Sequence, residues 1–177
     1  MDCFAGPDYV KGEGVKMKLS ELEEDLGSPS DFLDRPVSQE LILELLNHAV
    51  WAPNDGLREP WRFIFADNHN GILMQGLQEH APAYLLVLVK EEADHHKREE
   101  DFAAVYCLIQ NFRLLAYEQG LGVRSTLHDW MYDRSRAETF GVLGNERIAA
   151  VLELGYAAEQ PKGKAQVPEP QLQFELL

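Results

Sequence analysis

The sequence predicts an α+β fold, in which helices cover the faces of a sheet. Residues 83–89 are aliphatic on both faces and follow Pro82, as in a strand buried between two layers. Residues 99–119 are apolar almost all round, as in a helix surrounded by protein. Strand and helix patterns follow one another without regular alternation. That order favours α+β layers over a doubly wound parallel sheet.

The remaining elements follow from local signals. Ser20 and Glu23 form a capping box for a short helix, which Gly27 would end. Ser38 is the expected N-cap of the first core helix, and Pro53 is expected to stop it. Gly120 is placed to end the helix over 99–119 in the left-handed conformation. Strands at 61–66 and 147–156 and a polar helix at 134–143 complete the set, and the apolar face of the first core helix comprises Leu41, Ile42, Leu45, Leu46, Ala49 and Val50.

The chain length suits one domain with loose ends. Its 177 residues are enough to bury a sizeable core without disulfides or metals. Residues 1–18 are predicted to be an irregular arm, 19–160 the domain, and 161–177 a Pro- and Gln-rich C-terminal extension. That extension carries apolar residues at strand spacing. They indicate either association with a second chain or a disordered terminus.

Composition excludes several classes of partner. With 16 Lys and Arg against 30 Asp and Glu, the formal net charge is −14, which disfavours nucleic acid and anionic lipid as partners. The two cysteines, Cys3 and Cys107, form neither a disulfide framework nor a metal motif. The first 20 residues lack an apolar signal region, and no apolar run is long enough for a membrane span. We therefore expect a cytoplasmic protein that is not membrane-bound.

Two polar clusters have weak functional interpretations. His96 and Glu100 would share a helix face as metal ligands can, but no third ligand converges, and a charged helix start is the simpler interpretation, so no metal site is predicted. Ser125, His128 and Asp129 are too close in sequence for a catalytic triad. Neither GxxxxGK[ST] nor GxGxxG occurs, so the usual nucleotide-phosphate loops are absent from the sequence.

Residues 120–123, with sequence GLGV, have two interpretations. The simpler one is a helix C-cap followed by a turn into the next element. The functional one is a turn whose two glycines let a planar ring approach the backbone closely.

The stretch WAPNDGLREPWRF at 51–63 favours the functional interpretation. An apolar helix, then Ala52-Pro53-Asn54, then Glu59-Pro60-Trp61-Arg62-Phe63, resembles the nitroreductase family of flavin oxidoreductases. The resemblance runs from about residue 20 to 164 and includes 34–38, 101–111, 120–122 and 154–156. It implies a three-layer α+β domain, with a mixed and mainly antiparallel sheet flanked by helices. It also implies a homodimer that binds FMN at its interface.

The resemblance also implies which residues contact the cofactor. The loop at 53–57 would lie against the flavin ring, with Asn54 at its polar edge, and the turn at 120–122 would face the reactive flavin nitrogen. Residues 26–30 stand where the family carries an Arg-Arg-Ser-x-Arg stretch for the FMN phosphate, so only serine is kept. The predicted cofactor residues are Ser28, Ser30, Pro53, Asn54, Asp55, Leu57, Gly120, Leu121, Gly122 and Lys164.

Three alternatives can replace the missing arginines. Lys16, Lys18 or Arg35 can supply the cation, the partner subunit can supply one such as Lys164, or the ligand can be a flavin without phosphate. The resulting functional hypothesis is an oxidoreductase that uses FMN to pass electrons from NAD(P)H to a small aromatic nitro or quinone-like acceptor. The alternative is a dimeric binding protein that has lost tight FMN binding. No acid or base residue is assigned a catalytic role, and the candidates for the acceptor wall are Trp130, Tyr132 and Phe140.

Overall fold

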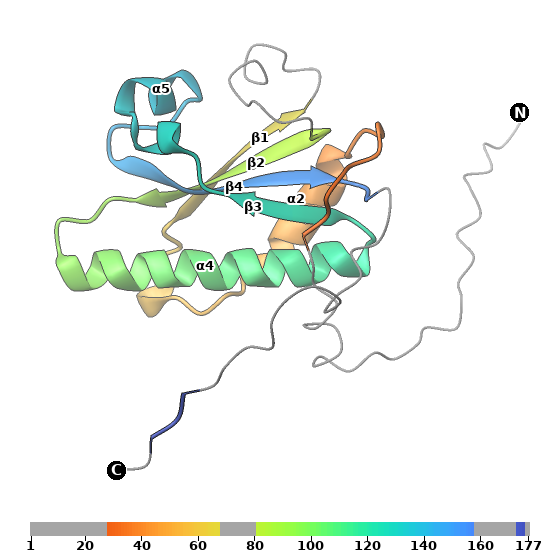
Figure 1. The fold of residues 1–177 in the computed structure, drawn as a ribbon. Helices are drawn as coiled ribbons and strands as arrows, with labels where there is room; N and C mark the ends of the chain where they lie inside the picture. The colour runs from red at the N-terminus through yellow and green to blue at the C-terminus, as the bar shows by residue number, and fades with distance from the viewer. Residues whose placement is uncertain (1–27, 68–80, 158–172, 176–177) are drawn as a thin grey trace, which may run out of the picture.

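The computed structural model describes residues 28–67, 81–157 and 173–175. Its centre is a four-stranded sheet in the order β1-β2-β4-β3 (Figure 1). All three strand pairings in the described residues are antiparallel, which agrees with the predicted, mainly antiparallel sheet. The strands are β1 (Trp61–Asp67), β2 (Ala83–Lys90), β3 (Gly122–Thr126) and β4 (Glu146–Gly155).

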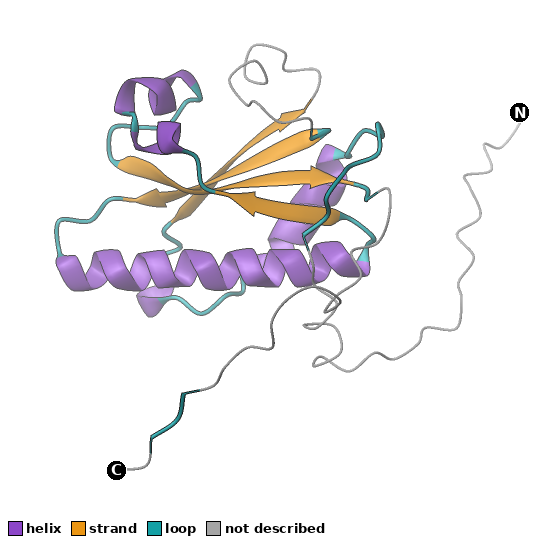
Figure 2. Ribbon diagram, viewed as in Figure 1, coloured by secondary structure: helices purple, strands orange, loops and turns teal. Residues whose placement is uncertain are grey.

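Helices cover both faces of this sheet, as Figure 2 shows. On one face α2 (Gln39–Ala49) and the long α4 (His95–Glu118) pack on a core that includes Leu85, Leu152 and Phe112. On the other face the short helices η2 (Asp129–Tyr132) and α5 (Arg134–Thr139) cover a second core around Leu86 and Val151. The molecule therefore has the predicted three-layer α+β arrangement.

Helix α2 forms where the sequence predicts it. The Ser38 hydroxyl accepts a hydrogen bond from the Leu41 backbone N–H at 3.3 Å, which confirms Ser38 as the N-cap. Ile42, Leu45, Leu46 and Ala49 are buried. The helix ends at Ala49, with Val50 as its C-cap, so it stops before it reaches Pro53.

Helix α4 is longer than predicted at its N-terminus. The sequence places its start at 99, but the helix begins at His95, because the Asp94 carboxylate accepts from the backbone N–H groups of His96 and Lys97. Its C-terminus is as predicted. Gly120 has φ +69°, and the Leu121 N–H donates to the Ala116 carbonyl at 2.8 Å, which together form a Schellman motif.

The strands at 61–66, 83–89 and 147–156 are confirmed with ends shifted by one residue. Strand β3 is the element that the sequence did not identify, because a five-residue run of Gly, Val, Arg, Ser and Thr has no clear alternation. It forms because β4 offers a long edge, along which Val123 pairs with Leu154. The predicted helix at 134–143 ends earlier, at Thr139, since Phe140 turns into the second core.

Several predictions concern residues that the structure does not describe. The short helix at 20–27, the arm at 1–18 and almost all of the extension at 161–177 lie outside the described ranges, as does Lys164. The domain boundaries stay predictions. No helix within the described ranges combines the length and the apolarity that crossing a bilayer would require.

Candidate functional site

The loop at 53–57, here called the shelf loop, is held to helix α4 by Arg58. The Arg58 guanidinium donates to the Asp101 carboxylate from Nε at 3.1 Å and from Nη2 at 2.8 Å. It also contacts Glu100 at 3.2 Å and Asp55 at 2.8 Å. The Asp101 side chain is 3% exposed, and its hydrogen bond, with that of Glu100, raises the pKa of Arg58. A buried carboxylate thus anchors the C-terminal end of the loop.

The side chain of Asn54 stabilises the shelf loop internally. Its amide nitrogen donates to the Ala52 carbonyl at 3.2 Å, and its amide oxygen accepts from the Glu59 N–H at 3.1 Å. The loop needs this support, since Leu57 and Glu59 have positive φ angles of 53° and 45°. Two large apolar side chains are exposed at this part of the surface: Leu57 in the loop is 82% exposed, and Trp51, two residues before the loop, is 85% exposed. Pro53 and Asp55 are also exposed.

The turn at 120–122, here called the glycine corner, lies at the C-terminal end of α4. Gly120 follows the C-cap Gln119 and ends the helix in the left-handed conformation, as the simpler interpretation predicts, and Leu121 is 2% exposed. Gly122 is needed for a different reason. A Cβ there would lie 3.0 Å from the Pro29 Cγ and 3.1 Å from the Gly155 carbonyl oxygen. The close approach to Gly122 is therefore made by the chain's own residues 29–32.

This packing brings two predicted cofactor residues to the glycine corner. Ser28 and Ser30 are exposed on either side of the buried Pro29. Arg124 of β3 donates to the Ser30 carbonyl at 3.1 Å and to the fully buried Glu153 carboxylate at 2.6 Å. The structure thus places the segment that replaces the family's arginine stretch directly beside the corner.

The shelf loop and the glycine corner lie at opposite ends of α4. Arg58 contacts α4 at Asp101, whereas the corner follows Glu118. At about 1.5 Å per residue, these two points are about 26 Å apart along the helix. Figure 2 agrees, since η1 (Asp55–Leu57) lies beside the N-terminal half of α4. That separation exceeds the length of a three-ring flavin system, so one chain cannot bring both segments to the same ring.

The three candidates for the acceptor wall lie on the other side of the sheet from α4. The Trp130 ring stacks on Phe140 with centroids 4.8 Å apart and on His128 at 5.8 Å. Phe140 is 6% exposed and belongs to the second core, whereas Tyr132 is 76% exposed. Of the three, Tyr132 has the most surface available for a ligand.

The two polar clusters with weak interpretations have structural roles. His95, rather than His96, faces an acid at helical spacing, with 3.4 Å between its Nε2 and the Glu99 carboxylate. Within the described ranges, no group of three or more His, Cys, Asp or Glu side chains is arranged to hold a metal. His128 Nε2 contacts the Thr126 hydroxyl at 3.0 Å, not Ser125.

Sequence reasoning missed the arginines that organise the site. Arg58 and Asp101 are 43 residues apart, and Arg124 and Glu153 are 29 apart, so no local spacing links either pair. The signal that was available is the shortage of cations in an acidic chain. In such a chain, each arginine can be expected to pair with a specific carboxylate.

Comparison with known proteins decides the family. A protein of Bacillus subtilis (strain 168) named "Putative NAD(P)H nitroreductase YfhC" is 34% identical in an alignment 161 residues long. The match covers 77% of this chain and 83% of the relative. The chain belongs to the nitroreductase family. Residues 28–81, which include the shelf loop, also match the family model described as Nitroreductase family.

Solved structures show the same nitroreductase fold. The nitroreductase-like family protein from Bacillus cereus superposes with a TM-score of 0.77 at 29% identity, covering 88% of this chain and 94% of that one. Iodotyrosine deiodinase bound to FMN and 3-iodo-L-tyrosine has a TM-score of 0.69 at 18% identity, covering 90% of this chain and 100% of that one. At that identity the second match shows the fold alone.

Proposed function

We propose that this nitroreductase-family protein is an FMN-dependent oxidoreductase that passes electrons from NAD(P)H to a small aromatic nitro or quinone-like acceptor. Membership of the family supports the class of reaction, since the Bacillus subtilis relative carries the name of an NAD(P)H nitroreductase. The observation that carries the proposal is the pair of exposed apolar side chains at the shelf loop and just before it, Leu57 and Trp51, each exposed by more than four-fifths. A rigid, exposed apolar loop suits a planar ring that covers it.

The separation of the two segments supports a homodimer. Since the shelf loop and the glycine corner lie about 26 Å apart along α4, a complete site would combine the shelf loop of one chain with the corner of its partner. Closing two chains around the ring would also cover Trp51 and Leu57. We expect the dimer to occur in the cytoplasm and to need neither nucleic acid nor membrane.

The residues present fit the parts of FMN unequally. At the ring, the shelf loop offers an apolar surface whose shape Asn54 and Arg58 maintain. At the glycine corner, close packing against Pro29 and Gly155 fixes the backbone at Gly122. The exposed residues Ser28 and Ser30 offer hydroxyl groups to a phosphate or ribityl chain. When bound, FMN would supply two-electron transfer from NAD(P)H to the acceptor. Trp130, Tyr132 and Phe140 stay candidates for the acceptor wall.

The phosphate end is the weak part of the fit. Replacing two arginines forfeits about 3 to 6 kcal/mol of charge-assisted hydrogen bonding, or on the order of 10² to 10⁴ in affinity. Of the cations proposed to replace them, Arg35 is the one within the described ranges, and its guanidinium stacks on the Tyr156 ring at 3.8 Å. Arg35 lies in the same segment of the chain as Ser28 and Ser30. Within that segment the Leu33 backbone N–H donates a hydrogen bond to the Tyr156 carbonyl.

The proposal is tested by reconstitution. Protein mixed with FMN and given NADPH without oxygen should lose the flavin absorbance near its visible maximum, and adding a nitroaromatic acceptor should restore it. Failure of NADPH and of NADH to bleach the bound flavin would contradict the enzymatic role.

A second candidate, a dimeric binding protein without tight FMN, is favoured by the missing arginines. Titration of FMN and riboflavin by fluorescence quenching separates the two. Preference for FMN supports a working phosphate site, preference for riboflavin supports a flavin site without one, and no quenching by either supports the binding protein.

A further inference from the structure

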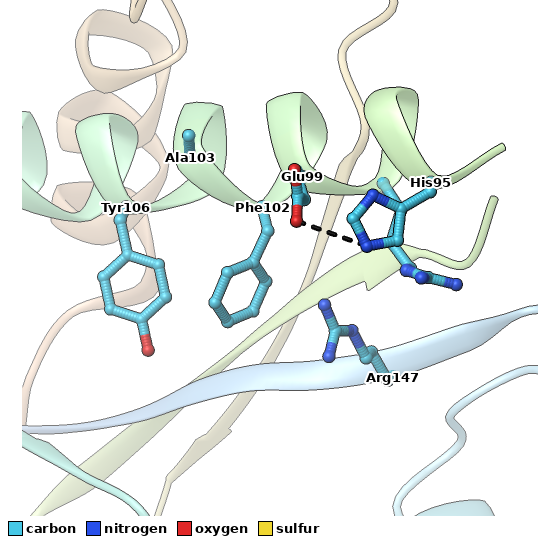
Figure 3. A pocket seen from close by; sticks show the side chains of 7 residues that line it. His95, Glu99, Phe102, Ala103, Tyr106 and Arg147 are labelled. Atoms are coloured by element: carbon cyan, nitrogen blue, oxygen red, sulfur yellow. Dashed lines mark ion pairs between the residues drawn. The ribbon is translucent and has the colours of Figure 1, made fainter.

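A cleft of about 600 Å³ opens between the N-terminal half of α4 and the start of β4 (Figure 3). Its wall is aromatic. The Phe102 and Tyr106 rings lie one helical turn apart, with centroids separated by 5.0 Å. Tyr106 is fixed by a hydrogen bond from its hydroxyl to the Ala149 carbonyl at 3.2 Å, yet 39% of it is exposed. The volume falls in the range that small-molecule sites occupy.

The cleft also carries positive charge. Arg147 of β4 places its guanidinium 4.4 Å from the Phe102 ring centroid, and Figure 3 shows it pointing from the strand toward the helix. Its Nε is buried without a hydrogen-bond partner, and within the described ranges no carboxylate forms an ion pair with this side chain. Arg98 lines the same cleft, also without an ion pair to any described residue. In a chain of net charge −14, two arginines without acidic partners at one cleft are unexpected.

We propose that this cleft binds a planar aromatic ligand carrying an anionic substituent such as a carboxylate, with the ring against Phe102 and Tyr106 and the anion at Arg147. Binding at this cleft does not rest on the proposed function; only reduction of the bound ligand would. Arg147 is already stacked on an aromatic face, so its guanidinium plane is oriented before a ligand arrives. A carboxylate would also give it the charged partner that it lacks.

Helix α4 lies between the cleft and the shelf loop. Glu100 and Asp101 bind Arg58, which holds the shelf loop, while the neighbouring Glu99 and Phe102 line the cleft. One turn of α4 therefore serves both. At about 3.6 residues per turn, the two sets of residues face opposite sides of α4, so the cleft is a site separate from the shelf loop.

The acidic group at the cleft does not cancel its charge. Glu99 is the carboxylate that lines it, and His95 lies 3.4 Å away from that carboxylate. Two guanidinium groups therefore face one acid. Because the rest of the chain repels anions, this local excess would select a small ring with one negative group over a larger polyanion.

The first test is a binding measurement. Titrating 4-nitrobenzoate and its neutral analogue 4-nitrobenzamide by calorimetry should show tighter binding of the carboxylate, by about 10- to 100-fold. Arg147→Met should remove that preference. Arg113→Met is the matched control, since Arg113 lies on α4 outside the cleft and its Nε is also buried without a partner. Arg98→Met, at a half-buried position, serves as a second variant if Arg147→Met does not fold.

The second test measures kcat/KM for both acceptors with the flavin-loaded protein. We expect the ratio of carboxylate to amide to fall in Arg147→Met and to stay within about twofold of the parent in Arg113→Met. Equal binding of the two compounds, or a preference that survives both arginine variants, would overturn the inference even if both compounds are reduced. An arginine-dependent binding preference without reduction of either would instead support the cleft and count against the proposed oxidoreductase.

Discussion

Arg58 and Asp101 join the shelf loop to helix α4 through two hydrogen bonds, of 3.1 and 2.8 Å, to one carboxylate oxygen that is almost fully buried. The pair has a clear structural purpose. Residues 56, 57 and 59 have positive φ angles, and two of them are not glycine, so the loop conformation is held by its surroundings rather than by its own preference.

Arg58→Met should disorder the shelf loop and weaken FMN binding by about tenfold, because one charge-assisted anchor is lost. Titration of FMN by fluorescence quenching measures the effect. Lys97→Met is the control, since it removes one positive charge from an exposed position on the same helix. Equal affinities in the two variants would mean that the loop does not need Arg58 to meet the flavin.

The two glycines of the glycine corner should respond differently to alanine. Gly120→Ala meets no atom within 4 Å but must adopt φ near +69°, so we expect a loss of about 1 to 2 kcal/mol in unfolding free energy and unchanged flavin affinity. Gly122→Ala should instead push residues 29–32 away from β3 and lower flavin affinity. Urea denaturation and FMN titration separate the two effects. Identical behaviour of the variants would contradict the packing assigned to Gly122.

Phe140 and Tyr132 should separate stability from acceptor binding. Phe140→Ala should cost about 3 to 5 kcal/mol of unfolding free energy, because its ring is buried against Trp130. Tyr132→Ala, at a position 76% exposed, should leave the melting temperature nearly unchanged and alter only the KM for acceptors. A large loss of stability in Tyr132→Ala would remove it from the acceptor wall.

Glu146 should make stability depend on pH in the acid range. Its carboxylate accepts from Arg62 Nε at 2.8 Å and Nη2 at 2.6 Å, and the Arg62 bonds hold the pKa of Glu146 below its ordinary value of about 4.3. A lowered pKa in the folded state means that this contribution is complete above about pH 4.3 and is lost as the pH falls through the folded-state pKa.

Glu146→Gln should therefore be less stable than the parent at pH 7, by about 1.5 kcal/mol, the lower end for such bonds, since 39% of the Arg62 side chain is exposed. The gap should close as the pH falls through the lowered folded-state pKa of Glu146. Urea denaturation across that range measures it. A difference that stays constant with pH would show that the pair does not couple to folding.

The sequence predicted the elements that depend on local signals. The Ser38 cap, the Gly120 end of α4 and the buried β2 strand each follow from residues within one or two turns of the chain. Strand β3 was missed because its reason to exist is the free edge of β4, which no local pattern contains. The early start of α4 was missed because Asp94 as a cap was hidden in a run of charged residues.

The candidate site divides in the same way. The resemblance of 51–63 to nitroreductases located the shelf loop, and the relative from Bacillus subtilis confirms the family. The separation of the shelf loop from the glycine corner, the contact of Ser30 with Arg124 and the cleft at Arg147 came only from the structure. Each depends on residues brought together from distant parts of the chain.

By itself the sequence determined the family, the acidic charge and the order of most helices and strands, because periodicity, capping and motif spacing are properties of neighbouring residues. The tertiary structure decided which charges meet. Asp101 and Glu153 are buried and so require a cation, and packing alone selected Arg58 and Arg124 for them while leaving Arg147 without an acidic partner among the described residues. A few arginines in a chain rich in carboxylates acquire their roles only when burial determines which acids cannot be left to water.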